Sequence, residues 1–200
     1  PESVQSGKFL FLGNVVKKSL FIKTAVALAL AAPLLASAES DISVGTAAAA
    51  ARLNFQVVIP RVLFLAVGTG NATLADNTTI DTLTYDYSAN AADVGSGTDS
   101  AAQGVSVRVL GNNGQIAIAA AGTGTGLTNG ADIIPWSEIL ASSTDATNFN
   151  VPAVGANTAP VINSGKVTNR TATWNFAYSN TAVAAPGTYS GQVTYTATMP

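Results

Sequence analysis

The chain closes on PGTYSGQVTYTATMP, residues 186–200. The Pro-Gly pair is typical of a turn, and after it large or apolar side chains alternate with polar ones. The apolar positions are Tyr189, Val193, Tyr195, Ala197 and Met199, and the positions between them carry mostly threonine. Because successive side chains of a strand point to opposite faces, this pattern predicts a closing strand with one buried and one polar face.

The stretch TWNFAY, residues 173–178, has the same period of two. Its large side chains, Trp174, Phe176 and Tyr178, alternate with smaller or polar residues. The threonines of the closing strand favour sheet over helix. We therefore expect the closing strand to pair with residues 171–178, so that the aromatic side chains of both seal one hydrophobic core.

Further stretches alternate in the same way or are continuously apolar, and most are bounded by Gly, Pro or Asn. They are 52–59, interpreted as a half-buried strand that Pro60 ends; 61–67, interpreted as a strand buried on both faces; 80–87, with Leu83, Tyr85 and Tyr87 on one face; and a hairpin of 105–109 and 116–120 joined by a turn at 111–114.

Helix signals are poor. The alanines at 47–51 are too few to nucleate a helix, and we interpret them as extended chain. Residues 134–140 fit either one helical turn or an edge strand beside Pro135. The sequence thus predicts an all-β fold, an antiparallel Ig-like or Greek-key β-sandwich of about seven or eight strands. A β-barrel is the alternative.

A secretory signal peptide is expected at residues 15–38. Three lysines open it, a mainly apolar run follows at 20–35, and the small residues Ala36, Ser37 and Ala38 form the cleavage site. The apolar run contains Lys23 and is shorter than the ~20 residues of a spanning helix. We therefore expect an exported bacterial protein, located in the periplasm, at the cell surface or outside the cell, with no stable membrane span after cleavage.

The expected organisation of the chain follows from this signal. Residues 1–14 stay an unassigned leader in front of it. Residues 39–51 form a short N-terminal extension, and residues 52–200 form a single β-sandwich domain. The part after the signal is long enough to bury one real core.

The composition excludes several classes of function. Residues 39–200 hold five basic and ten acidic side chains, too few positive charges for a nucleic-acid or anionic membrane surface. The chain has no His and no Cys, which excludes Ser-His-Asp and Cys-His catalysis and ordinary zinc sites. We expect no enzyme activity, no cofactor and no metal centre.

Three other features have a structural interpretation beside a functional one. The Gly-rich run at 122–126 lacks the following helix that a phosphate site needs, and we interpret it as a turn. Trp136 is the aromatic side chain that remains a candidate for stacking on a sugar. Five aspartates have the oxygens that calcium prefers, but their spacing fits turn capping better: Asp76, Asp81, Asp86, Asp93 and Asp99.

The closing PGTYSGQVTYTA after an aromatic strand resembles the last strand of bacterial surface β-sandwich proteins, in particular pilin subunits of the chaperone–usher type. The short extension at 39–51, ahead of the first firm strand, is similar to theirs in outline. Cell-wall-associated sandwich domains of Gram-positive bacteria end in similar strands. The pilin resemblance implies that the extension of one subunit completes the sandwich of the next by strand addition.

This resemblance implies donor positions at Ile42 and Val44, and an acceptor side formed by Trp174, Phe176, Tyr189, Val193 and Tyr195. It implies partners that are further copies or other surface subunits, with a periplasmic chaperone during assembly. Our first hypothesis is a secreted, non-enzymatic structural or adhesive surface protein, a pilin-like subunit of a fimbrium. The alternative is a self-contained extracellular or periplasmic binding module for carbohydrate or calcium.

Overall fold

The computed structural model describes residues 39–45, 48–70 and 73–200. The predicted leader and signal peptide lie outside these residues. Contacts along the chain separate Pro1–Val58 from a second compact unit, Ile59–Pro200, which holds all the described strands. The compact unit thus begins at Ile59, where we expected a domain beginning at Arg52.

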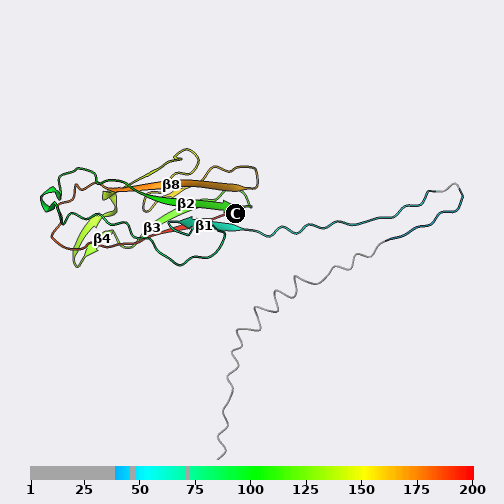
Figure 1. The fold of residues 1–200 in the computed structure, drawn as a ribbon, viewed down its shortest axis with the longest axis horizontal. Coiled ribbons are helices and arrows are strands. Elements are labelled where there is room, and N and C mark those ends of the chain that lie inside the picture. The colour runs from blue at the N-terminus through cyan, green and yellow to red at the C-terminus, as the bar shows by residue number, and fades with distance from the viewer. Residues whose placement is uncertain (1–38, 46–47, 71–72) are drawn as a thin grey trace, which may run out of the picture. The chain divides into compact units, whose positions relative to one another are not determined.

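The described part of the second unit is built from short strands (Figure 1). They are β1 (Leu63–Val67), β2 (Gln103–Gly111), β3 (Ala117–Gly122), β4 (Gly126–Asn129), β5 (Asp132–Pro135), β6 (Ile139–Ser143), β7 (Asn157–Thr158), β8 (Thr168–Tyr178) and β9 (Val193–Thr198). Two single-turn 3-10 helices, η1 (Ala91–Asp93) and η2 (Trp136–Glu138), interrupt them.

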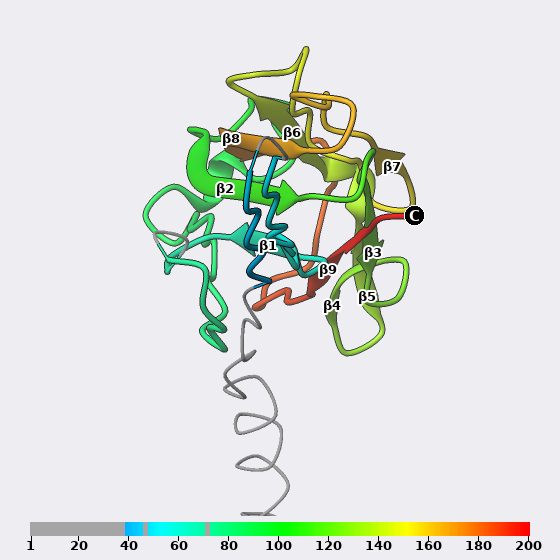
Figure 2. The ribbon, with the colours of Figure 1, turned by 90° about the vertical axis from the view of Figure 1, so that its right-hand side faces the viewer.

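The strands form two larger sheets and one hairpin. The first sheet has the order β1-β2-β8-β6, the second has the order β7-β3-β9, and β4 pairs with β5. Every pairing is antiparallel. Figure 2 shows β2, β8 and β6 of the first sheet beside β3, β7 and β9 of the second. The predicted all-β class with antiparallel sheets is confirmed, whereas an Ig-like connectivity stays a prediction.

The core lies between the two larger sheets and centres on Trp174. This side chain is fully buried on β8, where it pairs with Val105 of β2. Its ring lies 5.3 Å from that of Phe149 and 5.1 Å from that of Tyr195 on β9, measured between centroids. The indole Nε1 donates to the Phe149 carbonyl at 3.4 Å. Trp174 therefore joins the two sheets through aromatic packing and satisfies its polar atom.

The predicted alternation of β2, β3 and β8 is confirmed by burial. The buried hydrophobic side chains of the core cluster come from these strands, from Ile116 just before β3 and from the loop after β6: Val105, Val107, Val109, Ile116, Ile118, Phe149, Val151, Trp174 and Phe176. The chain does bend at 112–114, where Gly114 takes a φ of 87°, a value that glycine reaches without strain. The predicted hairpin is wrong, because β2 and β3 belong to different sheets: β2 pairs with β1 and β8, and β3 pairs with β7 and β9.

The predicted partner of the closing strand was wrong. β9 pairs with β3, from Ala117↔Thr198 to Gly122↔Val193, and not with residues 171–178. β8 already has β2 on one side and β6 on the other. Periodicity shows which face of a strand is buried but not which strand lies beside it, so Tyr195 reaches Trp174 across the core and not along one sheet.

Two further predictions about strands need correction. Residues 61–67 were expected to be buried on both faces, but β1 is an edge strand that pairs only with β2 and is at most half-buried. Residues 80–87 do place Leu83, Tyr85 and Tyr87 at half-buried positions, yet they join no ladder. This segment docks by its side chains: the Tyr85 and Tyr87 rings lie 6.3 Å and 6.0 Å from the Tyr178 ring.

The predicted half-buried strand at 52–59 is neither paired nor buried. All of its residues are exposed, and none is in a strand. Its alternation is real, but the segment belongs to no strand ladder among the described residues. The described alanines, residues 48–51, form neither helix nor strand.

Residues 134–140 combine both of the conformations considered for them. β5 ends at Pro135, η2 makes one turn, and β6 starts at Ile139. This turn buries Glu138, which is 7% exposed. The carboxylate accepts hydrogen bonds from Ser179 Oγ at 2.7 Å, Thr181 N at 2.9 Å and Ala182 N at 3.2 Å, and another from Thr181 Oγ1. Glu138 thereby fixes the loop that leaves β8.

The environment of Glu138 also fixes its charge state. Burial alone would raise the pKa of the carboxyl, but the hydrogen bonds from Thr181, Ser179 and Ala182 outweigh it and lower the pKa below the ordinary 4.5. Because the pKa of Glu138 is lower in the folded state, its carboxylate stabilises the fold at pH values above the pKa of the unfolded state. That contribution is lost as pH falls through the folded-state value.

We predict that Trp174→Ala lowers the free energy of unfolding by about 3–5 kcal/mol, because it removes a fully buried indole between two sheets. Urea unfolding followed by circular dichroism measures the change. Val183→Ala, at a position that is 91% exposed, is the control and should stay within about 0.5 kcal/mol of the parent. A loss below about 1 kcal/mol for Trp174→Ala would contradict this account of the core.

We predict that Glu138→Gln destabilises the protein at pH 7 by about 2 kcal/mol and flattens its stability below pH 4.5, because the neutral amide cannot accept all four hydrogen bonds. Urea unfolding between pH 3 and pH 7 is the measurement. The matched control is Glu39→Gln, because Glu39 makes an exposed ion pair with Arg52. Equal pH profiles for the parent and Glu138→Gln would rule out this role.

Candidate strand-addition site

Among the described strands, the first sheet ends on β1 and β6 and the second sheet ends on β7 and β9, so each of these four strands has a ladder on one side only. β9 pairs only with β3, and β1 pairs only with β2. Natural sheets protect such edges with charged side chains, proline or bulges. The sequence of β9 is VTYTAT and that of β1 is LFLAV, so neither contains a charged residue or a proline. The edges of β1 and β9 therefore lack these sequence protections.

The core side chains of β1 and β9 are incompletely covered. Leu65 and Val67 on β1, and Tyr195 and Ala197 on β9, pack against the buried cluster but are only half-buried. The two strands approach each other without forming a ladder. Burial still raises the pKa of the Tyr195 hydroxyl to about 12. We call these two strands with their half-buried side chains the β1–β9 edge.

The segment that precedes this unit is an exposed strand sequence. Side chains of one alternating set, Phe55, Val57 and Ile59, are 87%, 82% and 76% exposed, and Leu53 is 61% exposed. Arg52 just before them makes an ion pair with Glu39 at 2.9 Å. Single exposed apolar residues are common on proteins, but an alternating row of four is unusual. We call residues 53–59 the apolar segment.

The junction between the apolar segment and β1 is fixed by Asn112. The Asn112 side chain donates to the Pro60 carbonyl at 2.7 Å and accepts from Val62 N at 2.8 Å. The Arg61 guanidinium donates to the Met199 carbonyl at 3.1 Å. Residues 60–62 are thus tied to the turn after β2 and to the residue that follows β9.

The acceptor residues implied by the pilin resemblance lie at different depths. Trp174 and Phe176 are buried in the core, while Val193 and Tyr195 are half-buried on β9 at the open edge. Tyr189 precedes β9, and its hydroxyl donates to the Ala185 carbonyl at 3.1 Å. An added strand would therefore meet Val193 and Tyr195 directly, and Trp174 only through Tyr195.

The implied donor residues are exposed but isolated. Ile42 is 88% exposed and Val44 is 92% exposed, both within the described stretch 39–45. The apolar segment offers a longer row of larger side chains. Its period of two was visible in the sequence, where we interpreted it as a strand of the domain itself, so its exposure was missed.

Trp136 is packed on the protein. A Cβ atom added to Gly122 would lie 2.4 Å from its Nε1, and one added to Gly191 would lie 2.8 Å from its Cη2. The Nε1 donates to the Gly124 carbonyl at 3.4 Å. The ring therefore lies against the backbone of two glycines and is half-buried, which leaves one part of it accessible.

Two of the aspartates considered for calcium, Asp81 and Asp86, accept hydrogen bonds from residues of their own loops. Asp81 accepts from Thr69 N and Thr69 Oγ1, both at 2.7 Å, and these bonds lower its pKa. Asp86 accepts from Ser88 N at 2.8 Å. Within residues 39–45, 48–70 and 73–200, no group of three or more acidic side chains is placed to hold a metal ion.

Two comparisons with known proteins bear on this chain. No family model matches it, and no curated relative was found. In the described ranges there is also no helix long and apolar enough to cross a membrane.

We predict that backbone amides of the apolar segment exchange with solvent far faster than those of β2 and β8 in the dilute protein, because the segment has no ladder partner. Hydrogen–deuterium exchange read by mass spectrometry, at concentrations where the protein is monomeric, is the measurement. Protection of residues 53–59 equal to that of β8 would show that the segment is already paired within its own chain.

Proposed function

We propose that the protein is an exported structural surface subunit that assembles with copies of itself by strand addition. The apolar segment of one copy adds to the β1–β9 edge of the next. The observation that carries the proposal is the coexistence, in one chain, of an exposed alternating strand sequence and an unprotected sheet edge over a partly covered core.

The dimensions of the two surfaces support this pairing. At about 3.3 Å per residue, the seven residues of the apolar segment span roughly 23 Å, and the six residues of β9 span roughly 20 Å. One face of an added strand would bring Leu53, Phe55, Val57 and Ile59 toward the half-buried side chains of the edge. Each such side chain contributes about 1.5–3 kcal/mol when it is fully buried.

The donor comes from a second copy. A strand next to β1 in its own chain would require a turn at residues 60–62, and Asn112 and Met199 hold these residues. A subunit that cannot complete itself but can complete a neighbour forms an open, head-to-tail assembly. Such a subunit needs no catalytic residue, cofactor or metal.

We predict that Phe55→Glu with Val57→Glu weakens self-association about 100-fold, because two apolar side chains can no longer be buried. Analytical ultracentrifugation over a range of concentrations measures the effect. The matched control is Ile42→Glu with Val44→Glu, which places the same charges at exposed positions of the extension. A parent protein that stays monomeric at all concentrations, or a control that loses association equally, would refute the proposed donor.

The acceptor edge has a separate test. A peptide of residues 52–60 added to the Phe55→Glu, Val57→Glu protein should bind and slow the amide exchange of β9. The same peptide with glutamate at positions 55 and 57 should not bind. Protection at β6 in place of β9 would show that strand addition uses the other edge of the first sheet.

A further inference from the structure

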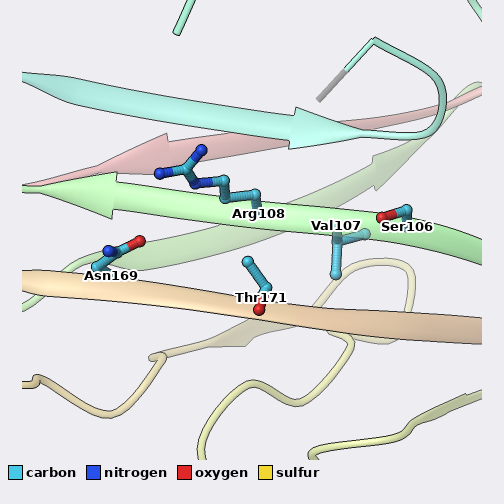
Figure 3. A pocket seen from close by; sticks show the side chains of 5 residues that line it. All are labelled: Ser106, Val107, Arg108, Asn169 and Thr171. Carbon is cyan, nitrogen blue, oxygen red and sulfur yellow. The ribbon is translucent and has the colours of Figure 1, made fainter. Parts of the chain in front are cut away.

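The outward face of the first sheet carries a polar hollow that strand addition does not use. It has a volume of about 360 Å³ and is lined by Ser106, Val107, Arg108, Asn169 and Thr171. Figure 3 shows Arg108 on β2, with Asn169 and Thr171 on the neighbouring strand β8. Arg108 alternates with the buried Val107 and Val109, and this pattern marks it as outward-facing and nothing more.

Arg108 is an uncompensated cation in this hollow. Its register partners are Ala66 on β1 and Thr171 on β8, and neither is acidic. Among the residues that the structure describes, no carboxylate lines the hollow. The Nε atom of Arg108 is inaccessible to solvent and has no hydrogen-bond partner among the described residues. A buried donor without an acceptor is rare in proteins, and a ligand that supplied the acceptor would relieve it.

The chemistry of the lining indicates the kind of ligand. A guanidinium binds a planar carboxylate through two parallel hydrogen bonds, and a rotation of the side chain toward the hollow would present Nε and one Nη together. The Asn169 amide and the Thr171 hydroxyl can donate to or accept from sugar hydroxyls. Arg108 is the one cation among the described lining residues, and residues 39–200 hold five basic and ten acidic side chains, which favours a monovalent anion over a phosphate dianion.

We propose that this hollow is a binding site for a sugar acid of hexuronate size, with Arg108 on its carboxylate and Asn169 and Thr171 on its hydroxyls. Its volume is at the lower end of the range for small-molecule sites, as a single monosaccharide requires. The site goes beyond the proposed assembly. It lies on the outward face of β2 and β8, whereas an added strand would occupy the β1–β9 edge.

The test is a titration of the isotope-labelled protein with D-glucuronate, followed by amide chemical shifts. D-Glucose, which lacks the carboxylate, and acetate, which lacks the hydroxyls, are the comparison ligands. We expect glucuronate to shift the amides of residues 106–108 and 169–171 and to bind about tenfold more tightly than either comparison ligand. If glucose bound as tightly as glucuronate, the proposed role of the carboxylate would be wrong. If acetate bound as tightly as glucuronate, the proposed role of the sugar hydroxyls would be wrong.

Two variants assign the binding to Arg108. Arg108→Gln should weaken glucuronate binding about tenfold. Arg108→Lys keeps the charge but cannot form two parallel hydrogen bonds with a carboxylate, so its affinity should lie between those of the parent and Arg108→Gln. Lys166→Gln, which removes an exposed cation from a loop, should bind as the parent does. Unchanged affinity in both Arg108 variants would overturn the proposal. The Phe55→Glu, Val57→Glu protein should bind glucuronate normally, so the test is independent of assembly.

Discussion

The contact between Trp174 and Tyr195 is the interaction on which the sandwich depends. One ring belongs to the four-stranded sheet and the other to the three-stranded sheet, and their centroids lie 5.1 Å apart. In a chain without cysteine, no disulfide can hold two sheets together, so packing must do so. The T-shaped contact with Phe149 and the bond from the indole to the Phe149 carbonyl fix the same side chain from the loop side.

This dependence explains why the edge matters. Trp174 itself is fully buried, but Tyr195, which covers it, lies on a strand that has a ladder on one side only. A strand added beside β9 would cover Tyr195. Its backbone would also form hydrogen bonds with the N–H and C=O groups of β9 that have no partner strand. Completion of the sheet and completion of the core are therefore the same event in the proposed assembly.

The surface of the sandwich divides into parts with different chemistry. Hydrogen bonding to a new strand occurs within the plane of a sheet, whereas side chains stand perpendicular to it. The row of Ser106 and Arg108 on β2 thus stays accessible when an edge is occupied. An assembled array of such subunits would repeat the Arg108 hollow along its length, and a weak site for a sugar acid would gain avidity from that repetition.

The sequence by itself determined the class of the fold and the buried faces of β2, β3 and β8. Valines 105, 107 and 109 and the aromatics of β8 were predicted as core residues and are buried, because the period of two follows from local geometry. The absence of histidine and cysteine likewise needed no structure. Tertiary structure alone decided which strands are neighbours, since the same apolar face fits any partner of matching length. It placed β9 beside β3, left Phe55 and Val57 exposed despite their strand-like pattern, and gave Arg108 no acidic neighbour. Those features depend on long-range pairing, and long-range pairing is not encoded in the periodicity of any single segment.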